Sequence, residues 1–252
     1  MHKHLSEFGF VVLEGLVDAS RLSALRQRVE ELFQQEGDRA GSEFKQERGS
    51  RRLANLVNKG EVFRQIVLDT TVLSCVRQVI GEEYKLSSLN ARSVDPHAQT
   101  PQPLHCDMAA LPDDAGYWVC NAVWMLDDFT EDNGPLRVVP GSHRWGRLPQ
   151  DEMEDATEPH PQEILVTGRA GTVVVTNSHL WHGGTGNRTD RSRTAVHAFY
   201  CRRDKPQQQY QKGLLDAQLL SELTPELKHL LAVDDPLNDQ LSSTDGPRSG
   251  FL

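Results

Sequence analysis

The chain has 252 residues, 37% of them hydrophobic, so it can bury one sizeable core, and all-β barrels of this length are commonly single domains. Its 27 Lys and Arg residues face 36 Asp and Glu residues, and the net charge of −9 argues against a general affinity for nucleic acid or anionic membranes, because such binding rests on basic patches. No apolar stretch approaches the length of a membrane span, and the first residues lead into no signal-like apolar run.

The first third of the chain predicts one strand followed by helices. Residues 8–13 are apolar and rich in β-formers, which indicates a strand. From Asp18 to Gln34, leucine and valine recur at spacings of three and four, which predicts an amphipathic helix with Asp18 as its N-cap. Residues 37–50 are polar and charged and predict a mobile loop. Residues 62–80 predict one or two short helices that end at Gly81.

From Tyr84 the chain changes to short apolar runs bounded by Gly, Pro, Asn and Asp, with no further helical pattern until about residue 207. Short strands at this density indicate a sandwich or jelly roll rather than a parallel α/β sheet. The candidate strands are 85–93, 105–108, 118–126, 136–139, 163–167, 172–176 and 194–201.

The last part of the chain predicts helices at 208–223 and 225–232, then an acidic, irregular tail from residue 234. No internal repeat and no linker divides the chain. We therefore expect one domain over 1–252, with a helical N-terminal part (about 15–82), a β core (about 84–202) and a C-terminal helical extension (about 207–252).

The most informative motif is an H-x-D pair, His105 and Asp107, in the segment Leu-His-Cys-Asp-Met. In an extended segment both side chains point to one face and Cys106 points to the other. With His182 the set becomes two imidazoles and one carboxylate, the facial triad that holds non-haem Fe(II) and leaves coordination positions open. Two alternatives stay open: the pair alone also fits a surface ion pair, and His179 competes with His182 for the third position.

Arg193, eleven residues after His182, suits a fork-shaped clamp on a carboxylate, and the usual co-substrate of such an iron is a dicarboxylate. In an alternating strand His197 shares a face with Arg193, about 7 Å along. His197 is thus a candidate pocket residue, with a hydrogen-bonded core histidine as the alternative. Asn121 is a lone amide in an apolar segment, and the carboxylates of the co-substrate or ordinary strand-end hydrogen bonds would satisfy it.

Two further side chains are candidates for the pocket. Gln102 lies three residues before His105, within reach of the metal side. Arg52 lies in the basic segment Arg51-Arg52-Leu53, for which a solvated charge is the alternative.

An ordered run of residues extends these motifs. Asn133-Gly134 leads into Pro140-Gly141-Ser142-His143, and His182, Asn187, Arg193 and Tyr200 follow. This set resembles the phytanoyl-CoA dioxygenase family, a branch of the Fe(II)/2-oxoglutarate oxygenases, and the resemblance reaches from about Phe8 to Tyr200. The family pattern T-x-x-N-G-x-L-x-V-x-P-G-S-H is matched at Thr130, Asn133, Gly134, Leu136, Val138, Pro140, Gly141, Ser142 and His143.

The resemblance implies a fold and a reaction. The fold is a double-stranded β-helix, a cupin-like jelly roll with helices packed on one outer sheet. Iron bound by His105, Asp107 and His182 would chelate 2-oxoglutarate, and Arg193 would hold the far carboxylate. With dioxygen, 2-oxoglutarate would be decarboxylated to succinate and a small or medium organic substrate hydroxylated. Family members also often place a basic residue at the position of Arg52, near co-substrate or substrate.

The sequence departs from the family at two positions. Many members have an aromatic residue where this chain has Leu104, and some have Ser or Thr where it has Gly184. Neither change removes a metal ligand, but both alter the surroundings of co-substrate or substrate. Asp107 disfavours halogenation, because related halogenating enzymes replace this carboxylate with a small residue.

Two other classes of function remain as hypotheses. One is a cupin-like metalloenzyme that does not use 2-oxoglutarate, which would have no need of Arg193. The other is a non-catalytic metal- or 2-oxoglutarate-binding protein. The loops expected to select substrate, 97–103, 108–116 and 144–161, are acidic to mixed, which weakly favours a neutral or cationic substrate.

The spacing of the cysteines indicates the cellular compartment. Cys75, Cys106, Cys120 and Cys201 lie far apart and form no C-x-x-C pair. They predict reduced, mostly buried thiols in a cytoplasmic protein.

Overall fold

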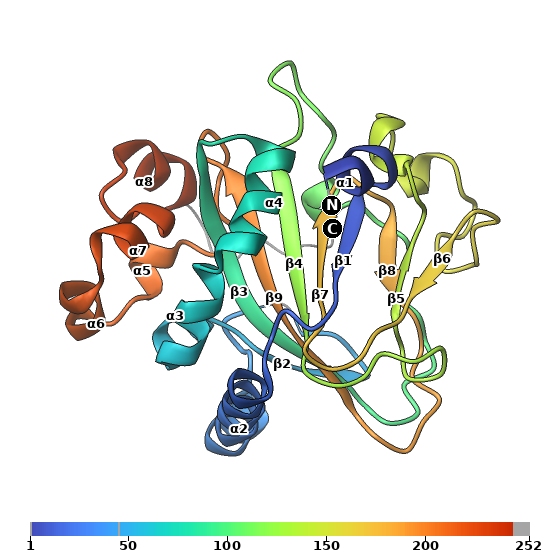
Figure 1. The fold of residues 1–252 in the computed structure, drawn as a ribbon, viewed down its shortest axis with the longest axis horizontal. Coiled ribbons are helices and arrows are strands. Elements are labelled where there is room, and N and C mark those ends of the chain that lie inside the picture. The colour runs from blue at the N-terminus through green and yellow to red at the C-terminus, as the bar shows by residue number, and fades with distance from the viewer. Residues whose placement is uncertain (1, 45, 244–252) are drawn as a thin grey trace.

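Two antiparallel β-sheets form the centre of the molecule (Figure 1). The computed structural model describes residues 2–44 and 46–243. The larger sheet has six strands in the order β1-β7-β4-β9-β3-β2, and the smaller sheet has the order β6-β5-β8. The strands are β1 Phe10–Leu13, β2 Ser50–Leu53, β3 Tyr84–Val94, β4 Val119–Met125, β5 Leu136–Val138, β6 Ile164–Val166, β7 Val173–Asn177, β8 His182–Gly184 and β9 Arg193–Arg202.

Helices cover one side of the larger sheet. Helices α2, α3 and α4 pack there, and α5 to α8 gather beside the edge near β3 (Figure 1). Within residues 2–44 and 46–243, no helix is long and apolar enough to cross a membrane. The helices are α1 His2–Phe8, α2 Ala19–Glu36, α3 Glu61–Val67, α4 Thr70–Ile80, α5 Gln211–Leu214, α6 Ala217–Glu222, α7 Pro225–Leu230 and α8 Pro236–Ser242.

Side-chain alternation decides what each face of the larger sheet covers. In β4, Ala122 and Trp124 belong to the core that the helices cover, whereas Val123 and Met125 pack toward the smaller sheet. The smaller sheet contributes Val138 to that second core. The predicted jelly roll with flanking helices is therefore confirmed: two antiparallel sheets face each other and helices lie outside one of them.

Most predicted elements are confirmed with small shifts at their ends. Asp18 caps α2, because its carboxylate accepts hydrogen bonds from the amides of Ser20 and Arg21. The predicted helical region 62–80 is two helices, and Gly81 ends the second. At the N-terminus Phe8 belongs to α1 instead of the first strand, because the chain turns at Gly9, whose φ is +83°. Strands β2 and β8 and helix α1 were not predicted.

The prediction of a strand over 105–108 is wrong. His105 forms an isolated bridge with His182, and residues Asp107–Ala109 then form a 3₁₀ turn in which Met108 has a φ of +55°. Cys106, between the two ligand candidates, has an extended conformation, with φ −99° and ψ 136°. One extended residue between His105 and Asp107 is enough to place both side chains on the same side, so the H-x-D argument needs no complete strand.

The C-terminal predictions need two corrections. Residues 208–223 do not form one helix, because the segment before α5 bonds to an irregularity in β3: the amide of Gln208 donates to the Ser87 hydroxyl, and the side chain of Gln207 donates to the Leu86 carbonyl. The predicted irregular tail from residue 234 contains α8, which Asp235 caps through the amides of Leu237 and Asn238. Residues 244–252 of that tail lie outside the described residues.

The different burial of two leucines predicts different losses of stability when each is replaced by alanine. Leu89 of β3 is fully buried beneath the helices, whereas Leu165 of β6 is 39% exposed. Leu89→Ala should lower the free energy of unfolding by about 2–5 kcal/mol, because it leaves a cavity. Leu165→Ala should change it by about 0.5 kcal/mol or less. Urea unfolding followed by circular dichroism measures both, and equal losses would contradict the assignment.

Candidate active site

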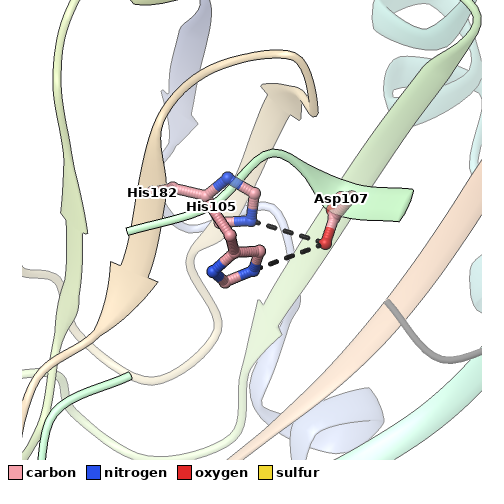
Figure 2. A group of neighbouring side chains, drawn as sticks. All are labelled: His105, Asp107 and His182. Carbon is pink, nitrogen blue, oxygen red and sulfur yellow. Dashed lines mark ion pairs between the residues drawn. The ribbon is translucent and has the colours of Figure 1, made fainter. Parts of the chain in front are cut away.

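Three side chains turn toward one point between the two sheets (Figure 2). Oδ1 of Asp107 lies 3.7 Å from Nε2 of His105 and 3.6 Å from Nε2 of His182. The ligand atoms of the three residues all lie within 4.8 Å of one another. Metal bonds of about 2.0–2.2 Å put two ligands of one ion about 3–4 Å apart, so the spacing suits a shared cation.

Backbone hydrogen bonds bring these residues together from distant parts of the chain. The amide of His105 donates to the carbonyl of His182 at 2.9 Å, and the amide of His182 donates back at 3.0 Å. The amide of Asp107 donates to the carbonyl of Ser178, directly after β7, at 3.0 Å. The segment that contains the H-x-D pair is thus fixed against the strand that begins with His182.

Both histidines are held in one tautomer. Nδ1 of His105 donates to the carbonyl of Pro103, and Nδ1 of His182 donates to the carbonyl of Leu180, each at 2.8 Å. A carbonyl oxygen only accepts, so Nδ1 carries a hydrogen in both rings, and a neutral ring keeps its lone pair on Nε2, which faces Asp107. Such backbone partners orient imidazole ligands at metal sites.

The charges of the three groups depend on one another. Burial opposes ionisation of Asp107, but the charge of His182 and hydrogen bonds from both histidines outweigh it and hold the pKa of Asp107 well below its usual range. Burial and the neighbouring His182 lower the pKa of His105. At His182 burial is outweighed by Asp107, which raises its pKa. The site therefore offers an ionised carboxylate flanked by imidazoles, and a bound cation would replace the shared proton.

All eight candidate residues from the sequence line one cavity. It runs from the three side chains described above along the inner face of the larger sheet. The other five residues on its wall are Arg52, Gln102, Asn121, Arg193 and His197.

Arg193 carries a buried positive charge on this wall. Its side chain is 3% exposed, one η nitrogen donates to the carbonyl of Gly134, and the guanidinium lies 4.2 Å from the ring centre of Phe129. Burial and the nearby Arg92 lower the pKa of Arg193 to about 9. Within the described part of the chain, no carboxylate forms an ion pair with it, and its Nε has no partner. A buried cation in this state favours an anionic ligand.

The amides of Asn121 and Gln102 differ in their surroundings. Nδ2 of Asn121 lies 3.5 Å from Oδ2 of Asp107, and its buried Oδ1 has no partner. Gln102 is bonded at both ends, because its oxygen accepts from the amide of Gly184 at 2.9 Å and its nitrogen donates to Glu47 at 3.1 Å. Asn121 therefore lies beside the carboxylate of Asp107, whereas Gln102 connects the wall to β8.

Arg52 and His197 lie further along the cavity. Arg52 is 7% exposed rather than solvated, and it forms an ion pair of 2.6 Å with Glu47. His197 shares the inner face of β9 with Arg193, as the alternation predicted, and its Nε2 is buried without a partner. Burial and the charges of nearby arginines lower the pKa of His197 to about 3, so its ring is neutral.

His179 lies away from this cavity. Its Nδ1 is 2.9 Å from Oδ1 of Asn177, and its ring packs 5.1 Å from Tyr117. Burial and the charge of His143 lower the pKa of His179 to about 3. Of the two competing histidines, only His182 points to Asp107.

Sequence reasoning missed several members of the wall. Asn90 and Arg92 lie on the inner face of β3 and line the cavity, and Glu47 connects Arg52 to Arg92 from the loop before β2. The signal for the first two was present, because polar residues alternate with the apolar Leu89 and Ala91 in a predicted strand. Glu47 had no such signal, since it lies in a polar loop.

Comparisons with known proteins identify the family of the chain. The sequence model of the phytanoyl-CoA dioxygenase (PhyH) family matches residues 5–195. The dioxygenase af480 of Aspergillus fumigatus is 29% identical over 176 residues, which cover 68% of this chain but only 55% of that protein.

Two solved structures are similar in fold. The non-haem α-ketoglutarate-dependent carbocyclase SnoK from nogalamycin biosynthesis aligns with a TM-score of 0.65 and 24% identity, over 81% of this chain and 83% of its own. HygX of Streptomyces hygroscopicus, solved with nickel and 2-oxoglutarate, aligns with a TM-score of 0.63 and 20% identity, over 79% and 84% of the two chains. The fold is thus one that such enzymes use. Because the sequence model of the family matches well over half of the sequence, the chain belongs to the phytanoyl-CoA dioxygenase family.

Proposed function

We propose that this protein is an Fe(II)/2-oxoglutarate-dependent dioxygenase that hydroxylates a small or medium organic molecule. His105, Asp107 and His182 would hold the iron, and Arg193 would bind 2-oxoglutarate. The observation that carries the proposal is the buried guanidinium of Arg193, without a carboxylate partner in the described structure, in the same cavity as the three converging side chains.

The residues fit both iron and 2-oxoglutarate. Two imidazole nitrogens and one carboxylate are the donor set of non-haem Fe(II) oxygenases, and three ligands leave positions open for other molecules. A carboxylate bound to Arg193 would pair a charge that burial otherwise penalises. With iron bound, 2-oxoglutarate and dioxygen supply the oxidation: the co-substrate becomes succinate and CO₂, with one oxygen atom going to succinate and the other to the substrate.

The protein's own residues would position these groups and keep the site dry. The carbonyls of Pro103 and Leu180 hold the two imidazoles with Nε2 inward. The amide of Asn121 lies next to the second oxygen of Asp107, where it would orient the carboxylate. The apolar side chains of Val123, Phe129 and Leu136 line the cavity wall, and they would exclude water from the charge of Arg193.

The names of similar proteins favour this function over the alternatives. A relative named as a dioxygenase and structures described as 2-oxoglutarate-dependent or solved with 2-oxoglutarate favour use of this co-substrate. A cupin-like enzyme without 2-oxoglutarate would leave the charge of Arg193 unexplained. For the compartment we propose the cytoplasm, which four buried, unpaired cysteines support.

The triad predicts different effects for two neighbouring histidines. His182→Ala should weaken Mn(II) or Fe(II) binding by more than the roughly 10–100-fold seen for outer-shell changes, because it removes a ligand. His179→Ala should leave metal affinity within about threefold, since its ring faces Tyr117. Calorimetric titration of the apoprotein with Mn(II) measures both, with circular dichroism as the check on folding. The reverse pattern would make His179 the ligand.

The co-substrate proposal predicts the effect of removing the buried charge. Arg193→Gln should weaken 2-oxoglutarate binding to the Mn(II)-loaded protein about tenfold or more, because a hydrogen bond to a charged group contributes about 1.5–3 kcal/mol. The matched control is Arg188→Gln, which removes an exposed arginine paired with Asp132. It should leave the affinity unchanged. If the unaltered protein did not bind 2-oxoglutarate, the proposal would be wrong.

Turnover requires a separate measurement. A metabolite library should be screened for compounds that raise iron-dependent succinate formation, and the product should be weighed by mass spectrometry. A gain of one oxygen atom, labelled from ¹⁸O₂, supports hydroxylation. Succinate formed with a product of unchanged oxygen content would instead indicate a different oxidation, such as a cyclisation.

A further inference from the structure

Arg92 is a second cationic group in the wall of the cavity that contains Arg193. In the register of β3 and β9, Arg92 faces Ala195 and Val94 faces Arg193. Arg92 and Arg193 are therefore diagonal neighbours on one face of the sheet. Such neighbours are about 7–8 Å apart at Cα, a distance that long side chains bridge.

The side chain of Arg92 is held in place by two other residues. Its Nε donates to Oε2 of Glu47 at 2.8 Å, and Oε1 of Glu47 accepts from Gln102 at 3.1 Å. Gln102 in turn accepts the amide hydrogen of Gly184 in β8. This chain of contacts fixes the guanidinium between the two sheets.

Gly184 lies next to this guanidinium. A Cβ at position 184 would lie 3.0 Å from Oε1 of Gln102 and 3.4 Å from Nη1 of Arg92. Nη1 therefore lies against β8, two residues beyond His182. Some members of the family have Ser or Thr at this position, so the arginine lies beside the place where those members carry a hydroxyl group.

The charges on this wall do not balance. Arg52, Arg92 and Arg193 provide three positive charges, whereas Glu47 is the one carboxylate that pairs with any of them in the described structure. The η nitrogens of Arg92 make no hydrogen bond to the described residues. Burial, and next the charges of these same arginines, lower the pKa of His197, as expected from an excess of positive charge. An anion placed between Arg92 and Arg193 would offset it.

We propose that Arg92 and Arg193 together bind the carboxylate of 2-oxoglutarate that lies away from the metal, so that a second arginine replaces the hydroxyl side chain that Gly184 lacks. This inference rests on the proposed function. It assigns Arg92 to the co-substrate, and it gives Glu47 and Gln102 the role of positioning residues for that guanidinium.

The test compares two ligands that differ only at the far carboxylate. 2-Oxopentanoate has a methyl group where 2-oxoglutarate has this carboxylate, and both keep the 2-oxo acid that would chelate the metal. Dissociation constants of both should be measured by calorimetry on Mn(II)-loaded protein. The variants are Arg92→Gln and, as the matched loss of one charge, Arg188→Gln.

We expect Arg92→Gln to weaken 2-oxoglutarate binding about tenfold or more and 2-oxopentanoate binding by less than about twofold. Arg188→Gln should change neither. Unchanged 2-oxoglutarate affinity in Arg92→Gln, or an equal loss for both ligands, would overturn the assignment while leaving the proposed function intact. If the unaltered protein bound no 2-oxoglutarate, the proposed function would fail as well.

A second variant tests the role of Gly184 and decides the case if 2-oxopentanoate binds too weakly to measure. In the Arg92→Gln background the space beside Gly184 is freed, so Gly184→Ser should restore 2-oxoglutarate affinity by about threefold or more. No recovery would show that this space is not next to the co-substrate's far carboxylate, and the two-arginine arrangement would be wrong.

Discussion

The pair of backbone hydrogen bonds between His105 and His182 is the contact on which the site depends. These residues lie 77 positions apart, yet each donates its amide to the carbonyl of the other, at 2.9 and 3.0 Å. With these two hydrogen bonds formed, the centroids of the two imidazole rings lie 4.5 Å apart. With the Asp107 amide bound to Ser178, the carboxylate can lie in only one region, opposite both rings. The convergence of the three side chains thus follows from three main-chain hydrogen bonds rather than from the side chains themselves.

A second constraint comes from charge. The inner face of the larger sheet brings three arginines into a cavity that few acidic groups enter. Burying a cation without a partner is costly, so such an arrangement persists where a ligand, or a positioning carboxylate such as Glu47, offsets it. The acidic loops around the cavity weakly favoured a neutral or cationic substrate, but the wall itself has the opposite sign. We connect this positive wall with the binding of a dicarboxylate co-substrate.

The limits of sequence reasoning are visible in particular elements. In β9 the alternation of side chains predicted that His197 shares a face with Arg193, and both line the cavity, because period two is a local property of an extended chain. The segment 105–108 and the region 208–223 were assigned wrongly. In each case the backbone bonds to a distant partner, Ser178 for the amide of Asp107 and the β3 irregularity for Gln208, and no local pattern encodes such a partner.

By itself the sequence determined the fold class, the family and the residues of the H-x-D pair, because these are encoded in local periodicity and in ordered motifs. Only the tertiary structure showed that His182, and not His179, lies beside Asp107, since this depends on the bridge to His105. Only the tertiary structure brought Arg92 and Glu47 to the cavity. Their approach depends on the register of β2, β3 and β9, which long-range pairing sets and a linear pattern does not contain.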